Sequence, residues 1–112
     1  MSDCIFCKLV SGEIPTDKVM ETKTLIAIKD IKPSAPHHYL FIPKKHYATA
    51  NDITTGDTIM TDIYEAAREL AKKLGIAESG YRIVTNVNKD GGQVVFHLHV
   101  HLLGGHKMGR LG

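Results

Sequence analysis

The chain has 112 residues, 43% hydrophobic and 23% charged, which is typical of a single globular domain spanning residues 1–112. The net charge of +2 is too small to indicate nucleic acid or an anionic membrane as a main partner, and no apolar run is long enough to cross a bilayer. The first residues show no basic segment followed by an apolar stretch, so we expect no signal peptide and a cytoplasmic protein.

The first half of the chain predicts one short helix and three strands. The helix covers residues 4–10 and is ended by Gly12 and Pro15. The strands are rich in β-branched and aromatic residues, and their expected bounds are 19–22, 25–30 and 38–42. Prolines at 33 and 36 place a loop before the third strand.

The second half predicts one long helix followed by two strands. Apolar residues recur every three or four positions over residues 57–74, which predicts an amphipathic helix that ends at Gly75. Strands are expected at Tyr81–Val87 and Phe96–Leu103, with a turn at 88–92 between them.

This order of elements predicts an α+β fold. We expect a five-stranded, mostly antiparallel sheet with one long helix and a short N-terminal helix. One long helix covers only one face of such a sheet. The other face is therefore free to bind a ligand or a second subunit.

Three histidines alternate with apolar residues in the last expected strand. On a strand, His97, His99 and His101 share one face, while the other face carries Phe96, Leu98, Val100 and Leu102 and belongs to the core. Three interpretations stay open. The row is a zinc or copper site, a set of structural histidines, or a catalytic centre with one imidazole as nucleophile and a neighbour as acid.

The residues just before the row favour the catalytic interpretation. Gly91 and Gly92 allow backbone amides to approach a ligand closely, and a turn of exposed amides forms a nest for an anion. Gln93 offers a further side-chain donor. A phosphate held by this turn would lie beside the histidines.

The two cysteines form a C-x-x-C pair, Cys4 and Cys7, which indicates metal binding or redox chemistry in a reducing compartment. A thioredoxin-like motif follows a strand, and none is expected before Cys4. A closed zinc site would need two further ligands.

The run from Gly91 to Gly105, GGQVVFHLHVHLLGG, resembles the signature of the histidine triad (HIT) family, in its Hint branch of purine nucleoside phosphoramidases. Further blocks resemble other parts of the same family, and they are Ile5-Phe6, residues 12–15 (GEIP), Asp30-Ile31, Pro33, Ala35-Pro36, His38 and residues 42–46 (IPKKH). The resemblance covers nearly the whole chain, which is then a single HIT domain with the HIT-like fold.

The resemblance implies a reaction and its residues. His99 would attack the α-phosphorus of a nucleoside 5′-phosphoramidate to form a nucleotidyl-histidine intermediate, and His101 would assist proton delivery to the leaving amine. His97 and His38 complete the implied catalytic set. The implied substrate-binding residues hold the ribose, the phosphate and the purine, and they are Asp30, Ile31, Asn86, Gly92, Gln93, Ile5, Phe6, Leu9 and Ile14.

The resemblance also implies partners and a metal. The ligand would be a purine nucleotide, AMP or GMP, and the protein a homodimer with no organic cofactor. Several bacterial relatives pair such cysteines with two histidines around zinc, so the implied structural zinc ligands are Cys4, Cys7, His46 and His97. A dinucleoside polyphosphate hydrolase and a nucleotide-binding interaction protein with incidental turnover stay as alternatives.

Two positions depart from the family pattern. Val94 stands where many members carry serine or another polar residue near the leaving group, and valine donates no hydrogen bond. The tail, residues 106–112, lacks a tryptophan found in some relatives. Both departures concern the leaving group of the implied reaction.

Overall fold

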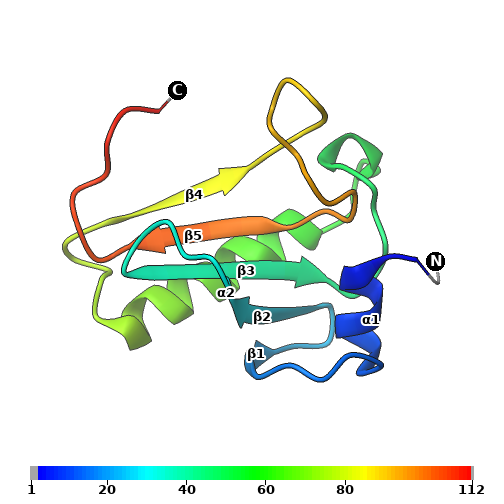
Figure 1. Cartoon of the computed structure of the whole chain (residues 1–112), viewed down its shortest axis with the longest axis horizontal. Coiled ribbons are helices and arrows are strands. Elements are labelled where there is room, and N and C mark those ends of the chain that lie inside the picture. The colour runs from blue at the N-terminus through cyan, green and yellow to red at the C-terminus, as the bar shows by residue number, and fades with distance from the viewer. Residues whose placement is uncertain (1–2, 112) are drawn as a thin grey trace.

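A computed structural model describes residues 3–111. The elements in chain order are α1 (Ile5–Ser11), β1 (Lys18–Glu21), β2 (Leu25–Lys29), β3 (His37–Pro43), the 3-10 helix η1 (Ala50–Asp52), α2 (Ile59–Leu74), β4 (Tyr81–Thr85) and β5 (Val100–Gly104). The strands form one antiparallel sheet in the order β1-β2-β3-β5-β4. The predicted α+β fold, with five antiparallel strands, one long helix and a short N-terminal helix, is confirmed (Figure 1).

Helix α2 covers one face of the sheet and lies behind it in Figure 1. Its apolar residues fall every three or four positions, so one stripe is buried while the opposite side stays charged. That stripe packs against inward-facing strand residues in the main core, which includes Ala27, Phe41, Val100, Leu102, Ile63, Ala67 and Leu70.

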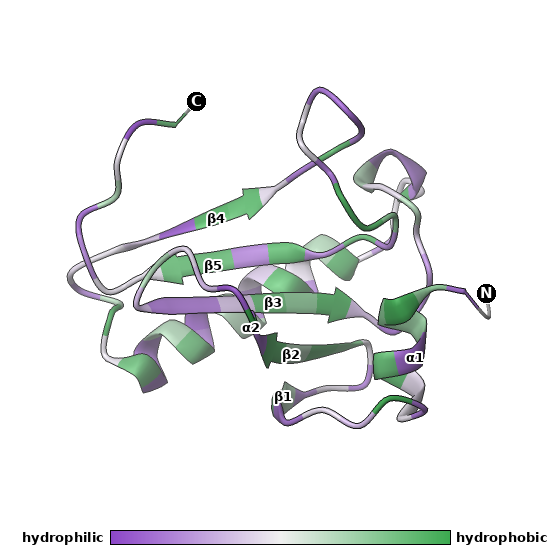
Figure 2. Ribbon diagram, in the orientation of Figure 1, coloured by the Kyte–Doolittle hydropathy of each residue, from purple (hydrophilic) through white to green (hydrophobic). Residues whose placement is uncertain are grey.

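The other face of the sheet carries a smaller apolar cluster. Side chains alternate along a strand, so β2 and β3 also send residues to this side, and the cluster joins Phe6 of α1 to Ile26, Ile28, Leu40 and Ile42. Strand β2 is hydrophobic along most of its length because both of its faces are buried (Figure 2). Helix α1 lies at one end of this face (Figure 1).

The last predicted strand is shorter than expected. Strand β5 begins at Val100, not at Phe96, because Leu98 donates its backbone N–H to the carbonyl of Tyr47 at 2.7 Å instead of joining the sheet. Phe96, expected in the core, is 49% exposed as a result. Strand β4 also ends earlier, at Thr85 rather than Val87.

Helix η1 was not predicted, although its signal is present in the sequence. Thr49 and Asp52 form a capping box, in which the Thr49 hydroxyl accepts from Asn51 N–H and the Asp52 carboxylate accepts from Thr49 N–H, both at 3.0 Å. This turn leads from β3 to α2. Over residues 3–111, no helix combines the length and the hydropathy needed to cross a membrane.

Candidate active site

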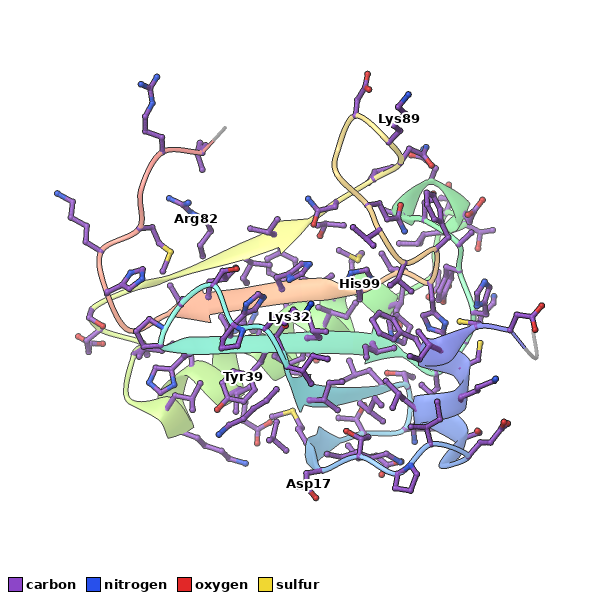
Figure 3. The ribbon with its side chains drawn as sticks, viewed as in Figure 1. Asp17, Lys32, Tyr39, Arg82, Lys89 and His99 are labelled. Carbon is purple, nitrogen blue, oxygen red and sulfur yellow. The ribbon has the colours of Figure 1, made fainter. Side chains whose placement is uncertain are left out.

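Three histidines gather on the sheet face opposite α2. His99 lies just before β5, His101 within β5, and His38 on the neighbouring strand β3 (Figure 3). The ring centroids of His99 and His101 are 5.2 Å apart, and those of His38 and His101 are 5.1 Å apart. The β3–β5 register opposes Leu40 to His101, which places His38 diagonally across from His101 on the same face.

The backbone fixes the proton of His99 on one nitrogen. Nδ1 of His99 lies 2.8 Å from the carbonyl oxygen of His97, and because a carbonyl only accepts, Nδ1 carries the proton. Nε2 therefore keeps its lone pair. Burial lowers the pKa of His99, which is 9% exposed, so the neutral ring with a nucleophilic Nε2 is the form present at neutral pH.

A second chain of hydrogen bonds fixes His38 and His101. The backbone N–H of Ser34 donates to Nδ1 of His38 at 3.0 Å, so the proton of neutral His38 resides on Nε2. That Nε2–H donates to Nδ1 of His101 at 2.9 Å, which leaves the His101 proton on Nε2. A carboxylate oxygen of Asp30 lies 3.5 Å from the same His38 nitrogen.

These bonds hold His101 as a neutral donor. Its pKa is lowered to about 4, first by burial and then by the neighbouring His99 and His38. A proton on Nδ1 of His101 would also face the His38 Nε2–H across the 2.9 Å contact. His101 thus presents a neutral Nε2–H, suited to stabilising charge on a phosphoryl oxygen.

His97 belongs to a different cluster. Its ring is fully buried, and its Nε2–H donates to the carbonyl oxygen of Pro43 at 2.8 Å, so Nδ1 keeps its lone pair. That Nδ1 lies 3.3 Å from Cys4 Sγ, 3.5 Å from Cys7 Sγ and 3.0 Å from His46 Nδ1. Both ring nitrogens are therefore engaged away from His101, and His97 contacts His99 through its carbonyl and not through its imidazole nitrogens.

The cluster of Cys4, Cys7, His46 and His97 fits a zinc ion. Its four donor atoms lie within 4.8 Å of one another, as the ligands of a tetrahedral site do, and two thiols with two imidazoles are a common zinc set. Burial, followed by the neighbouring Cys4, raises the pKa of the Cys7 thiol. A dication at the centre would supply the positive charge that two thiolates need.

A second group of possible ligands, Asp30, His38 and His101, lies within the same 4.8 Å limit but fits a metal less well. Nε2 of His38 would have to lose its proton to bind a cation, which would move the proton to Nδ1. The Ser34 N–H already points at Nδ1 and opposes that change. The backbone thus leaves a lone pair on His97 Nδ1 that can face a metal, whereas it places a proton on His38 Nε2.

The glycine turn, predicted as an anion nest, uses two of its amides for its own hydrogen bonds. The backbone N–H groups of Gly92 and Gln93 donate within the turn, to the carbonyls of Lys89 and Asn88, both at 3.0 Å. A side chain at Gly91 would collide with the Val87 carbonyl, and Gly92 has φ +80°, so both glycines are needed to close the turn. Their role in this structure is to shape the loop.

Gln93 is also committed to the protein. Its buried side chain donates to the carbonyls of Ala48 at 2.8 Å and Val95 at 3.0 Å, and accepts from Asn88 N–H at 2.9 Å. Both amide hydrogens are used, so none is left for a phosphate. Gln93 therefore holds the loop in this structure, and its predicted contact with a phosphate stays a prediction.

The remaining predicted substrate residues separate into buried and exposed groups. Phe6 is 8% exposed, and its ring edge packs on His99 with centroids 5.0 Å apart, while Leu9 packs against the smaller cluster and Ile14 is half-buried. Ile31 is 92% exposed and Ile5 is 50% exposed. The core leaves these two apolar side chains free to meet a ligand.

Two polar residues of the predicted set also bond locally. The Asn86 amide donates to the Gly91 carbonyl at 2.7 Å and supports the turn. One Asp30 oxygen accepts from Lys32 N–H at 2.8 Å. Asp30 and His38 border a cavity of about 240 Å³.

Sequence reasoning missed the backbone groups that organise the site. The Ser34 N–H and the Pro43 carbonyl each fix one histidine, and the Tyr47 carbonyl holds the segment that carries His97 and His99. Every residue has such groups, so residue type gives no signal for them.

Comparison with known proteins agrees with this geometry. The HIT domain model matches residues 11–108. The purine nucleoside phosphoramidase of Escherichia coli strain K12 is 41% identical over 108 residues, covering 96% of this chain and 91% of its own. A HIT family hydrolase from Legionella pneumophila is 50% identical with a TM-score of 0.92 and 96% of both chains covered.

A histidine triad protein from Clostridium difficile is 42% identical, with a TM-score of 0.96 over 100% of this chain and 98% of its own. The family model and these relatives span nearly the whole chain, including the three histidines of the row. The chain therefore belongs to the HIT domain family.

Proposed function

We propose that this protein is a nucleotide-binding hydrolase that cleaves the P–N bond of purine nucleoside 5′-phosphoramidates, giving AMP or GMP and an amine. The observation that carries the proposal is the tautomer of His99, which leaves a lone pair on Nε2, in a ring whose centroid lies 5.2 Å from that of His101 with its Nε2–H donor. The named activity of the 41% identical relative supports the substrate class.

The first step would form a bond between His99 Nε2 and phosphorus and break the P–N bond. The bonding pair leaves with the nitrogen, which takes up a proton from solvent and departs as the amine. His101 donates its Nε2 hydrogen bond to a phosphoryl oxygen while charge develops there. In the second step water attacks phosphorus and the bond from phosphorus to His99 Nε2 breaks. A proton of the water returns to solvent, and the bonding pair restores neutral His99.

The direct test compares the wild type with His99→Ala on a fluorogenic adenosine 5′-phosphoramidate. We expect kcat to fall by more than about a thousandfold while AMP still binds, because only the attacking nitrogen is lost. His106→Ala is the matched control, since His106 is an exposed histidine in the tail, and it should retain activity. Equal turnover by His99→Ala and the wild type would refute the proposal.

A parallel assay with a dinucleoside polyphosphate separates the alternative hydrolase. If the protein hydrolyses the dinucleoside polyphosphate and not the phosphoramidate, His99 would be the nucleophile of P–O cleavage instead. Binding of AMP without turnover of either substrate would favour an interaction protein.

We also propose a structural zinc at Cys4, Cys7, His46 and His97. Zinc in a closed site with four protein ligands has no open position for water and serves to brace the fold. The zinc ion would join the N-terminal end of α1 to the segment before β5. Metal analysis of untagged protein should find about one zinc per chain, reduced in Cys7→Ala, and a metal-free wild type would contradict the proposal.

The nucleotide and the assembly form part of the same proposal. The exposed Ile31 and Ile5 would contact the purine, and the Asp30 carboxylate oxygen that does not accept from Lys32 would accept from the ribose hydroxyls. A homodimer would form through β4, which is an outer strand of the sheet with every residue partly exposed.

A further inference from the structure

The two cysteines are placed for chemistry beyond metal binding. Both are free thiols, three residues apart at the start of α1, and the backbone N–H of Cys7 lies 3.3 Å from the Cys4 sulfur. Their sulfur atoms lie within 4.8 Å of each other and are only partly buried. A C-x-x-C pair with neighbouring sulfurs is the arrangement in which a dithiol and a disulfide interconvert.

We propose that Cys4 and Cys7 form a reversible disulfide whose closure disengages His97 and lowers turnover at His99. A low-molecular-weight disulfide serves as the oxidant. One cysteine sulfur attacks it and releases the first small thiol, and the second cysteine then displaces the remaining half. Two electrons pass to the oxidant, two protons leave with the two small thiols, and one Cys4–Cys7 bond forms.

The two sulfurs cannot form a disulfide and at the same time contact the histidines as metal ligands. In the reduced form Cys4 Sγ and Cys7 Sγ lie 3.3 Å and 3.5 Å from His97 Nδ1, and Cys7 Sγ lies 3.2 Å from His46 Nδ1. A disulfide brings the sulfurs to bonding distance from each other and removes both thiolates from the cluster. This part rests on the proposed zinc, because a zinc held there would lose half of its ligands and be released.

Phe6 and His97 connect the two cysteines to His99, the proposed nucleophile. Phe6 lies between the two cysteines on α1, and its ring packs edge-on against both His97 and His99, with centroids 5.9 Å and 5.0 Å apart. The His97 carbonyl holds the Nδ1 proton of His99 at 2.8 Å. Movement of α1 or of His97 therefore changes the position of the nucleophile.

The experiment treats purified, zinc-loaded full-length protein with glutathione disulfide and follows three readouts. Trypsin cleaves after Lys8, so both cysteines lie in the peptide 1–8, whose mass should drop by two hydrogens. A chromophoric chelator should detect released zinc. Turnover of the phosphoramidate should fall by at least about tenfold and recover after dithiothreitol and zinc are added.

The matched variant is Cys4→Ser/Cys7→Ser, whose turnover, whatever its basal value, should be the same before and after oxidant. If that variant does not fold, recovery of the oxidised wild type by dithiothreitol serves as the control. Persistent free thiols, or glutathione left attached to one cysteine, would overturn the inference. So would a disulfide that forms with turnover unchanged.

Failure of the proposed activity is recognised separately. A protein without phosphoramidase activity shows no turnover even in its reduced form, whereas the peptide mass and the zinc release need no turnover at all. In that case AMP affinity replaces turnover as the third readout, and an affinity unaffected by the disulfide would overturn the link to His99.

Discussion

Ser34 acts on the histidines through its backbone, not through its hydroxyl. Its N–H fixes the proton of His38, which in turn fixes that of His101. The His97 carbonyl does the same for His99. The protonation pattern of the candidate centre is thus determined by peptide groups whose positions depend on the fold.

Removing this one N–H should disturb the whole chain of bonds. In Ser34→Pro, Nδ1 of His38 loses its donor, so the proton can move there and His101 no longer presents Nε2–H. We expect kcat to fall about ten- to hundredfold. Steady-state kinetics on a protein that circular dichroism shows to be folded would test this.

Ser34→Ala is the matched control, because it keeps the N–H and alters only an exposed side chain. It should retain wild-type kcat. Equal kcat for the alanine and proline variants would show that the tautomer of His38 has no part in turnover.

The low pKa of His101 predicts a dependence of stability on pH. The ring has a pKa of about 4 in the native state and 6.5 when unperturbed, so between these values the unfolded chain binds the proton that the native protein excludes. The free energy of unfolding should therefore fall as the pH drops from 6.5 to 4. The loss is on the order of 3 kcal/mol at most, since one pKa unit corresponds to about 1.4 kcal/mol.

Urea unfolding of the wild type and of His101→Asn across this range would measure the effect. Asparagine does not titrate, and both proteins share the cysteine–histidine cluster, so their difference isolates His101. The wild type should lose more stability toward low pH than the variant. Parallel curves would contradict the assigned pKa shift.

At the scale of elements, the loop between β4 and β5 is held by one buried amide. Gln93 joins three backbone groups, from Ala48, Asn88 and Val95. Gln93→Ala should reduce the free energy of unfolding by about 3 kcal/mol, at roughly 1 kcal/mol per hydrogen bond. Gln93→Glu should be at least as damaging, because a carboxylate would face two carbonyl oxygens.

Chemical denaturation of both variants would check this expectation. Val94→Ala provides the control, since Val94 is 86% exposed and its truncation should change stability by less than about 0.5 kcal/mol. If Gln93→Ala were as stable as the control, water would replace the three Gln93 hydrogen bonds with no loss of unfolding free energy, contrary to the prediction.

The elements that sequence predicted well are those with a regular period. The apolar stripe of α2 located its buried side, and the runs of β-branched and aromatic residues in β2 and β3 located two strands, because each strand buries residues on both faces of the sheet. The alternation of histidines with apolar residues over residues 96–102 predicted the wrong environment for Phe96 and His97. There the His97 ring donates to the Pro43 carbonyl and the Leu98 N–H donates to the Tyr47 carbonyl, which are tertiary contacts that a local pattern does not contain.

The candidate site was predicted in part for the same reason. The histidine row indicated two residues, His99 and His101, whose rings lie together, and Cys4, Cys7 and His46 lie around His97 as the resemblance implied. The assignment of Gly92 and Gln93 to phosphate stays a prediction. In this structure their backbone N–H groups bond within the turn, and the Gln93 side chain donates to Ala48 and Val95. Residue type indicates which groups can donate, and only the fold determines where those hydrogens are used.

At the scale of the whole molecule, the two outer strands differ. β1 has four residues and a register shift between Lys18 and Met20, features that make an edge a poor template for another strand. β4 pairs with β5 in continuous register over five residues. The proposed homodimer should therefore use β4.

Amide hydrogen exchange tests dimerisation through β4, and the other outer strand, β1, serves as the internal control. In a dimer the outward-facing amides of β4 should be protected, while those of β1 exchange rapidly. Sedimentation should give twice the chain mass. A monomer, or equal exchange at both edges, would contradict pairing through β4.

The order of the sheet also governs how the protein is made. β5 lies between β3 and β4 although it follows both in the chain, so β4 leaves the ribosome before its neighbour in the sheet exists. At about 5–20 residues per second, the nascent chain waits with β3 and β4 unjoined until residues 100–104 emerge. His99 and His101 arrive with that strand, so closing the sheet and completing the histidine centre are one event late in synthesis, and shorter nascent chains have no such centre.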